Sequence, residues 1–465
     1  MSRVLKKTKI DKSYKLVKVL DDNFQIDFKI TFSREPNIRE MRFLEILLKE
    51  FNITKKSSNR FFLDARGNCK DIKRLFNTEI SLLRQDKKEY FCETKDIEIP
   101  QGYDFILGII GLNNCPRFKS YSKTSSIKSI DTSFTPIQVG EFYDFPFQSR
   151  GSNRLIALIE LDGGYRTQDL KYYFIDYLKL GRLPVVYPIV MDGAKNNPDS
   201  PFSQEVVLNI EIAAAIAKCA ITLVYFAPNS ELGYYDAVYF ALTNQSYMPP
   251  CAISTSWGTP EVSNTQTFMD SMNLLFDYGR KRRINIFAAS GNFGSSGGLP
   301  GLNVDFPASS PYVIGCGGTS MIVKNNNKLI DEVVWSGSGG GFSKIFPKPE
   351  YQKDIQSDTR GVPDVAGSAD PDKGYIIYRN GKFESVGGTS AVAPLYAGLT
   401  ALMSSTKGSV PFLNDKMYPI AEEVCFDIIK GSNGPDGKYD ATIGWDPCTG
   451  NGRIYGDKLL ASLYT

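Results

Sequence analysis

The sequence contains no histidine among its 465 residues. This absence excludes Ser-His-Asp and Cys-His catalysis, because both mechanisms use an imidazole as the base. It also excludes most zinc sites, apart from those built only of cysteine and carboxylate ligands. Any hydrolytic chemistry must therefore depend on carboxylates, lysine or a thiolate.

Targeting signals and a dominant charge are missing as well. No stretch approaches the length of a membrane span, and the basic N-terminus lacks the apolar run of a secretion signal. The net charge is +3 with both signs interspersed, which does not favour nucleic-acid binding. We therefore expect no membrane and no nucleic-acid partner, and a chain that is cytosolic or exported by an unrecognised route.

The eight cysteines are scattered and form no C-x-x-C motif. Free buried thiols are the expectation for such a pattern. Cys425 and Cys448 are the one pair that we consider for a disulfide.

Length and composition predict a globular protein of two or three domains. Hydrophobic residues make up 42% of the chain and charged residues 23%, which is enough to bury a large core. Residues 1–116 have the pattern of a small α+β domain. Residues 117–133 are rich in Ser, Lys and Thr, as an exposed linker and natural cleavage region would be.

Residues 134–465 alternate apolar strands with helices, the pattern of a parallel sheet covered on both faces. The predicted strands here are 155–161, 184–191, 221–227, 252–256, 284–289 and 312–315. The predicted helices are 167–178, 204–217, 234–243 and 265–281. In the N-terminal domain we expect strands at 24–32, 89–99 and 105–112, and helices at 37–51 and 71–76.

The stretch Gly387-Gly388-Thr389-Ser390 precedes a helical run from Ala391 to Met403. The two glycines allow a tight turn, and either Thr389 or Ser390 could cap the helix that follows. A serine there lies beside unpaired N–H groups that can hold an oxyanion. An ordinary N-cap serine is the alternative that an isolated motif of this kind would favour.

Several long segments occur in one order that resembles the sedolisin (serine-carboxyl peptidase) family, in particular its kumamolisin-like branch. They are Phe134-Thr135-Pro136, Ala157–Leu161, Tyr225–Asn229, Ser256-Trp257-Gly258, Asp305–Tyr312 and Gly361–Gly367. The resemblance implies a subtilisin-like α/β peptidase domain at 134–465. It also implies an activation prodomain at 1–116 that acts as an intramolecular inhibitor, and a monomeric zymogen that cleaves peptide or protein substrates. Members of the family are usually secreted or lysosomal, whereas the compartment of this chain stays open.

By this resemblance Ser390 would be the nucleophile and Glu205 the base. Asn209 stands where the family has an aspartate four residues after that glutamate, a spacing that places both side chains on one helix face. Asn292 stands where the family has an aspartate that helps bind the oxyanion. Glu160 and Trp257 match an accessory acid and tryptophan. Without the family, these residues could equally be surface amides and carboxylates, a turn residue and core packing.

A calcium site is the second implication of the resemblance. Asp427 and Asp446 would supply the charge, while Ile428, Thr442 and Gly444 would supply backbone carbonyls, which suits a cation that prefers oxygen ligands. Thr442 replaces a glycine that is common there. A metal-free turn is the alternative interpretation of this Gly- and Asp-rich region.

We therefore predict a serine endopeptidase of the sedolisin type, weakened because two family aspartates are Asn209 and Asn292. An amide at 292 can donate a hydrogen bond at any pH, and an amide at 209 adds no second charge beside Glu205. The amide at 292 frees catalysis from acid dependence, which predicts a pH optimum above that of acid-acting relatives. The alternative is an inactive scaffold that keeps the fold for binding or regulation.

Overall fold

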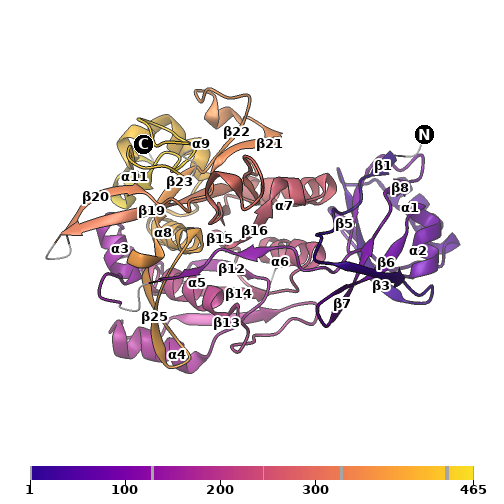
Figure 1. Ribbon diagram of the computed structural model, residues 1–465, viewed down its shortest axis with the longest axis horizontal. Coiled ribbons are helices and arrows are strands. Elements are labelled where there is room, and N and C mark those ends of the chain that lie inside the picture. The colour runs from indigo at the N-terminus through magenta and orange to yellow at the C-terminus, as the bar shows by residue number, and fades with distance from the viewer. Residues whose placement is uncertain (1–2, 127–129, 245, 325–327, 435–438, 464–465) are drawn as a thin grey trace. The chain divides into compact units, whose positions relative to one another are not determined.

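The computed structural model describes residues 3–126, 130–244, 246–324, 328–434 and 439–463. The chain forms two compact units, and we describe each by itself (Figure 1). One unit holds the residues up to Arg117 together with Pro228–Asp236 and Val262–Leu275. The other holds Phe118–Ala227, Ala237–Glu261 and Phe276–Thr465. Within the described ranges, no helix is both long and apolar enough to cross a membrane.

The N-terminal unit is built of antiparallel sheets and two capped helices. One sheet has the order β4 (Thr54–Ser58), β5 (Phe62–Asn68), β3 (Gln25–Phe32), β9 (Ile106–Ile110). A second has the order β2 (Lys15–Val19), β6 (Ile80–Gln85), β7 (Lys88–Glu93), and β1 (Arg3–Leu5) pairs with β8 (Ile97–Ile99). Helices α1 (Ile38–Glu50) and α2 (Cys69–Phe76) begin where the side chains of Asn37 and Asn68 accept a backbone N–H. The predicted α+β organisation of this region is confirmed.

The larger unit is built around a sheet that has eight strands in the part of the chain described. Its order is β13 (Val185–Val190), β14 (Ile221–Phe226), β12 (Leu155–Glu160), β15 (Ala252–Thr255), β17 (Asn285–Ala289), β19 (Ile314–Lys324), β20 (Lys328–Val334), and β23 (Val365–Ser368) also pairs with β19. All pairings are parallel except that of β19 with β20. The apolar runs predicted these parallel strands, because both faces of such a sheet are buried.

Two buried helices, α5 (Ser203–Ile216) and α8 (Val392–Lys407), pack against each other beside the central strands (Figure 1). Their contact is close at Gly398, where a Cβ atom would lie 2.8 Å from the Cβ of Ile216. A side chain there would force the two helices apart. The glycine thus lets α8 lie close to the C-terminal end of α5.

Shorter elements complete this unit. The helices are α3 (Pro136–Phe142), α4 (Thr167–Lys171), α6 (Glu231–Thr243), α7 (Gln266–Lys281), α9 (Leu413–Met417), α10 (Ala421–Val424) and α11 (Gly456–Ser462), of which α6 and α7 begin in segments of the other unit. The strands are β10 (Lys119–Ser120), β11 (Lys123–Thr124), β16 (Trp257–Pro260), β18 (Asp305–Phe306), β21 (Gly341–Pro347), β22 (Thr359–Val362), β24 (Tyr375–Arg379), β25 (Lys382–Gly387), β26 (Cys425–Phe426) and β27 (Arg453–Ile454).

The predicted strand 89–99 is two separate strands, β7 and β8. Two other predicted elements differ clearly in extent from those observed. Strand β19 continues to Lys324, well beyond the predicted end at Gly315, because the glycines that follow lie between close neighbours rather than in a turn. The predicted helix 167–178 is α4 followed by a π-helical segment, Tyr172–Tyr177. Clustered aromatic side chains in that segment pack on one another, for example Tyr173 on Tyr177 at 5.8 Å between ring centroids.

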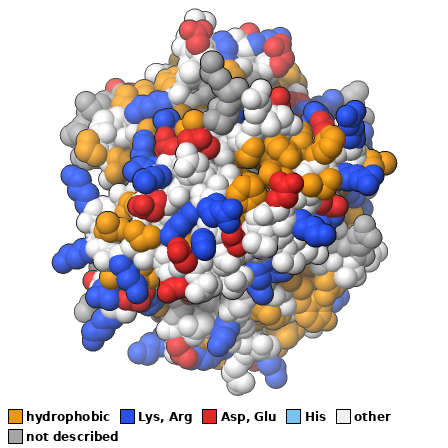
Figure 2. Space-filling view, turned by 90° about the vertical axis from the view of Figure 1, so that its right-hand side faces the viewer, with side chains coloured by type: hydrophobic (Ala, Val, Ile, Leu, Met, Phe, Trp, Pro, Cys, Tyr) orange, Lys and Arg blue, Asp and Glu red, His pale blue; other side chains and the backbone are white. Residues whose placement is uncertain are grey.

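Charges of both signs are mixed on the face of the molecule that Figure 2 shows. On that face, Lys and Arg side chains alternate with Asp and Glu, and no field of one sign covers it.

All eight cysteines are free thiols, so Cys425 and Cys448 do not form a disulfide.

Candidate active site

Ser390 lies in the turn that leads into α8. Gly388 has φ +93°, a conformation that side chains disfavour, and a 3-10 turn, Thr389–Ala391, follows it. Neither Thr389 nor Ser390 caps α8 with its side chain, so the predicted N-cap is wrong. The Ser390 hydroxyl instead donates to Oε2 of Glu205 at 2.9 Å.

Glu205 lies in the first turn of α5 and is fully buried, as is Ser390. Burial raises the pKa of Glu205 to about 7, although hydrogen bonds from Ser390, Ser122 and Asn209 lower it. A carboxyl group with this pKa exchanges its proton near neutral pH. The pair therefore has the geometry and the proton affinity of a nucleophile and its base.

Asn209 lies one turn further along α5 and joins two carboxyl groups. Its Nδ2 atom donates to Oε1 of Glu205 at 3.2 Å and to Oε1 of Glu160 at 2.8 Å. Trp257 Nε1 donates to Oε2 of Glu160 at 3.0 Å, and Ser256 Oγ lies 3.1 Å from Asn209 Oδ1. Burial and the charge of Glu205 raise the pKa of Glu160 to about 8. The predicted residues of this network thus lie together.

Asn292 lies in the loop after β17, and its amide orientation is fixed by the Ser390 turn. Its Oδ1 atom accepts the backbone N–H of Thr389 at 2.9 Å and lies 3.1 Å from the Thr389 hydroxyl. Because Oδ1 faces Thr389, the amide nitrogen faces the opposite direction. That nitrogen donates to the carbonyl oxygen of Tyr121 at 2.5 Å.

A segment of the chain itself, residues 119–125, lies across this site as an extended strand. Strand β10 pairs antiparallel with β16, and β11 pairs antiparallel with β25. The backbone N–H groups of Tyr121 and Ser125 continue the two ladders, at 3.2 Å to the carbonyl of Ser256 and 3.0 Å to that of Ser385. Extended peptides bind to sheet edges in this way.

The peptide bond between Tyr121 and Ser122 contacts both Asn292 and Glu205. Its carbonyl oxygen accepts from Asn292, and its nitrogen donates to Oε2 of Glu205 at 2.6 Å. The same Oε2 atom accepts the Ser390 hydroxyl. A Cβ atom on Gly388 would lie 2.0 Å from the Tyr121 carbonyl oxygen, so this position must be a glycine for the carbonyl to fit.

Sequence reasoning missed Tyr121 and Ser122, which contact Asn292 and Glu205 from the polar stretch 117–133. That stretch was expected to be exposed, yet Phe118 and Tyr121 are buried, at 4% and 0% of their surface. Two aromatic residues spaced three apart in an otherwise polar segment were the available signal. Residues 127–129 of the same stretch lie outside the described residues.

The residues predicted to bind calcium lie in one loop region. Asp446 accepts from the backbone N–H groups of Cys448 at 2.8 Å and Thr449 at 2.9 Å, and from that of Thr442 at 3.1 Å. Asp427 Oδ2 accepts from Gly444 N–H at 2.8 Å. The loop that includes Thr442 and Gly444 thus links both carboxylates.

Asp427 has one oxygen without a partner among the described residues. Oδ1 of Asp427 is buried and accepts no hydrogen bond among the described residues. An unpaired buried oxygen of this kind is expected where a carboxylate binds a cation. No group of three or more Asp, Glu, Cys or His side chains gathers there or elsewhere in the described ranges. A cation here would therefore need backbone carbonyls besides the two carboxylates.

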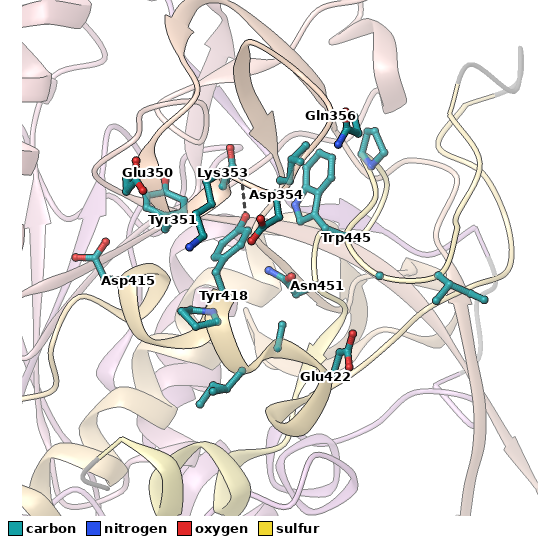
Figure 3. Close-up of a pocket in the computed structure, with 18 of the residues that line it drawn as sticks. Glu350, Tyr351, Lys353, Asp354, Gln356, Asp415, Tyr418, Glu422, Trp445 and Asn451 are labelled. Carbon is teal, nitrogen blue, oxygen red and sulfur yellow. Dashed lines mark hydrogen bonds between the residues drawn. The ribbon is translucent and has the colours of Figure 1, made fainter.

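A cavity of about 1060 Å³ lies beside this loop, away from Ser390 (Figure 3). Figure 3 shows Tyr418, Asp354 and Trp445 around it, and it is lined by none of the Ser390 network. Tyr418 is held by Gln352 Nε2 at 2.7 Å and donates to Asp364 at 2.7 Å. The hydroxyl of Tyr418 is thus engaged within the fold.

Comparison with known proteins identifies the family. The chain is 36% identical over 434 residues to kumamolisin from Bacillus sp. (strain MN-32), a match that covers 85% of this chain and 78% of that protein. The chain belongs to the sedolisin family. Sedolisin from Pseudomonas sp. (strain 101) is 26% identical over 444 residues, covering 87% of this chain and 75% of that protein.

Two further comparisons agree with membership of the sedolisin family. A model of the subtilase family matches residues 217–418. The solved structure of Pseudomonas sedolisin complexed with two molecules of pseudo-iodotyrostatin superposes with a TM-score of 0.64 at 25% identity, covering 71% of this chain and 97% of that one. The subtilisin-like α/β fold with a preceding small domain is thereby confirmed, and the relatives support a peptidase.

Proposed function

We propose that this sedolisin-family chain is a serine endopeptidase in which Ser390 attacks the substrate carbonyl and Glu205 is the base. The observation that supports this most strongly is that one oxygen, Glu205 Oε2, contacts both the Ser390 hydroxyl and a peptide nitrogen. Such an oxygen can take the proton of the nucleophile and deliver it to the leaving nitrogen.

Asn292 stabilises the developing oxyanion in this proposal. Its nitrogen already contacts a carbonyl oxygen in the ground state, and Thr389 holds the amide in the donating orientation. A carboxyl group at this position could donate only while protonated, whereas an amide donates at every pH. Removal of one such donor costs about 10²–10³ in turnover in subtilisin.

Asn209, Glu160 and Trp257 orient the base. Because Asn209 donates to both carboxyl groups, it fixes Glu205 without carrying a proton between them. Glu205 keeps a raised pKa even without an aspartate beside it, because burial is the largest cause. The base form of Glu205 therefore accumulates as the pH rises through about 7, and activity should rise with it.

Calcium is a second part of the proposal. The carboxylates of Asp427 and Asp446 and the backbone carbonyls of Ile428, Thr442 and Gly444 would hold the ion, and the unpartnered Oδ1 of Asp427 supports this assignment. The ion would stabilise the loop through its charge and would take no part in catalysis. We also propose that residues 1–116 act as an activation prodomain and 117–133 as its connection to the peptidase.

The peptidase activity can be tested by digestion of a mixed peptide library from pH 3 to pH 8, with products identified by mass spectrometry. Wild type should cleave peptides best near or above neutral pH, and Ser390→Ala and Glu205→Gln should not. Glu141→Gln, which changes an exposed glutamate in α3, is the matched control for the second variant. If wild type never exceeds Ser390→Ala at any pH, the chain is an inactive scaffold and the peptidase proposal is wrong.

A further inference from the structure

The side chain of Tyr121 is enclosed, and one carboxyl group contacts its phenol. Tyr121 has 0% of its surface exposed, and its hydroxyl donates to Oδ2 of Asp305 at 2.5 Å. Asp305 lies in β18 and is itself 2% exposed. Burying a carboxyl group costs free energy unless the group has a hydrogen-bond partner. For Asp305 the Tyr121 hydroxyl is such a partner.

Glycines make the space for this side chain. A Cβ atom on Gly258 would lie 2.9 Å from the Tyr121 hydroxyl oxygen and 3.0 Å from Cε2 of its ring. Cβ atoms on Gly291 and Gly297 would lie 2.5 Å and 2.9 Å from the Asp305 carboxyl oxygens. Side chains at these three positions would displace either the ring or the carboxyl group, so the surroundings are shaped for a long, flat side chain with a polar tip.

The segment on both sides of Tyr121 is held in register with the chemical groups. Lys119 is paired with Gly258 before the bond, and Lys123 with Gly387 after it. Between these two anchors, the Tyr121–Ser122 bond contacts Asn292 with its oxygen and Glu205 with its nitrogen. A one-residue slip would move Tyr121 out of its enclosed site and reverse the side-chain directions.

We infer that the Tyr121–Ser122 bond is the bond at which this chain cleaves itself, and that Asp305 selects a tyrosine at the position before the cut. This inference rests on the proposed peptidase function. In the reaction, Ser390 Oγ bonds to the Tyr121 carbonyl carbon, and its proton passes through Glu205 Oε2 to Ser122 nitrogen as the C–N bond breaks. Water then hydrolyses the Tyr121 ester, giving a new carboxylate at Tyr121 and regenerating the Ser390 hydroxyl.

The preference for tyrosine over phenylalanine follows from the buried carboxyl group. Oδ1 of Asp305 is buried and has no hydrogen-bond partner in the described part of the chain. The other oxygen, Oδ2, accepts the hydrogen bond of the Tyr121 phenol. Burial raises the pKa of Asp305 to about 7, and the Tyr121 hydroxyl lowers it. Whether ionised or protonated, the carboxyl group loses its partner when the phenol is removed. Leaving a buried polar group unpaired corresponds to about 10- to 100-fold in rate.

The test is incubation of the purified full-length chain from pH 4 to pH 8, followed by intact mass and N-terminal sequencing. Wild type should give a new N-terminus at Ser122 with a first-order rate that does not depend on protein concentration. Ser390→Ala should stay intact. Tyr121→Phe should be cut about 10- to 100-fold more slowly, whereas Tyr187→Phe, the same change at a half-exposed tyrosine in β13, should be cut at the wild-type rate.

A peptide with the sequence of residues 117–126 separates the inference from the proposed function. Self-cleaved wild type should cut it after tyrosine, and a version with phenylalanine there should be cut about 10- to 100-fold more slowly. Ser390-dependent library cleavage with a new N-terminus other than Ser122, or equal rates for the two peptides, overturns the inference while the peptidase function stands. Cleavage of Ser390→Ala at the same bond overturns it as well.

Discussion

At the scale of single residues, the two asparagines have different consequences. Asn292 replaces an acid with a group that donates independently of pH, and Thr389 fixes its direction. Asn209 keeps two carboxyl groups oriented but removes an ionisable group from between them. The amide at 292 is compatible with catalysis at neutral pH. The amide at 209 changes how protons are distributed, because it leaves Glu205 and Glu160 without an ionisable group between them.

Asn292→Asp should lower kcat/KM at pH 7–8 by about 10²–10³, because a carboxylate only accepts hydrogen bonds. In the acid range, where this aspartate is protonated and can donate, the loss should be smaller, so the optimum moves to lower pH. Kinetic pH profiles on a tyrosine-containing peptide check this. Equal profiles for Asn292→Asp and wild type would show that the donor is not used in the transition state.

Asn209→Asp should move the rise of activity to higher pH. A third buried carboxyl group beside Glu205 and Glu160 makes ionisation of the group more costly, so the pKa of the base should rise further. The same pH profiles measure this, together with those of Asn209→Ala as the control that removes the orienting amide. A variant whose activity rises at lower pH than that of wild type would contradict the account.

The sequence allowed Ser390, Glu205, Asn209 and Asn292 to be assigned, because each occurs in a motif that the family shares. The contacts of Asn292 with Tyr121 and of Glu205 with Ser122 could not be predicted, since Ser122 lies 83 residues before Glu205 in the chain. Asp305 was part of a matching motif but had no assigned role. We infer its role in selecting tyrosine only from the hydrogen bond that its carboxyl group accepts from the enclosed Tyr121 phenol.

At the scale of elements, the parallel strands were predictable and the glycine-rich connections were not. Strand β12 is buried at every residue, so its apolar run identified it directly. Strand β19 includes Gly315, Gly317 and Gly318, whose composition suggests a turn. Those glycines are there because side chains would collide with neighbouring segments; a Cβ on Gly317, for example, would lie 2.6 Å from Pro363.

The loop with Asp427 and Asp446 should stabilise the protein when calcium is bound. Chelation should lower the melting temperature, because an ion that binds only the folded state contributes about 2.7 kcal/mol at a concentration of 100 Kd. Asp446→Ala should melt lower than wild type and be insensitive to chelator. Asp440→Ala, which removes an exposed aspartate from the same region, should keep the wild-type response. An unchanged wild-type melting temperature on chelation would remove calcium from the account.

At the scale of the whole molecule, buried carboxyl groups make stability depend on pH. Glu211 lies in α5, is fully buried, and is not part of the Ser390 network. Burial raises its pKa well above the usual value, and only its Oε2 atom accepts a hydrogen bond, from Tyr378 N–H at 3.0 Å. Its protonated form is therefore favoured in the folded state.

The stability that Glu211 contributes should be present below its unfolded pKa of about 4.3 and should be lost as the pH rises through its folded value. Glu211→Gln mimics the protonated form, so it should reduce the fall in melting temperature between pH 5 and pH 8. Melting curves at several pH values check this, with the exposed Glu141→Gln as control. If both variants fall as steeply as wild type, Glu211 is not the source.

Catalysis and stability thus have opposite pH requirements in this chain. Glu205 must lose its proton to act as a base, whereas the buried carboxyl groups favour folding while they are protonated. Near neutral pH both requirements are partly met. In this chain, which has no histidine, the proposed proton acceptor is a buried acid, and the compromise follows from its burial.

Covalent labelling of the self-cleaved chain with a fluorophosphonate tests the central claim most directly. Mass spectrometry of the digested protein should locate the adduct on Ser390, with a labelling rate that rises as the pH passes about 7 and Glu205 becomes ionised. Glu205→Gln, checked for folding by circular dichroism, should label at least about 10²-fold more slowly, the lower range of general-base catalysis. An adduct on another residue, or equal labelling rates for Glu205→Gln and wild type, would contradict the account.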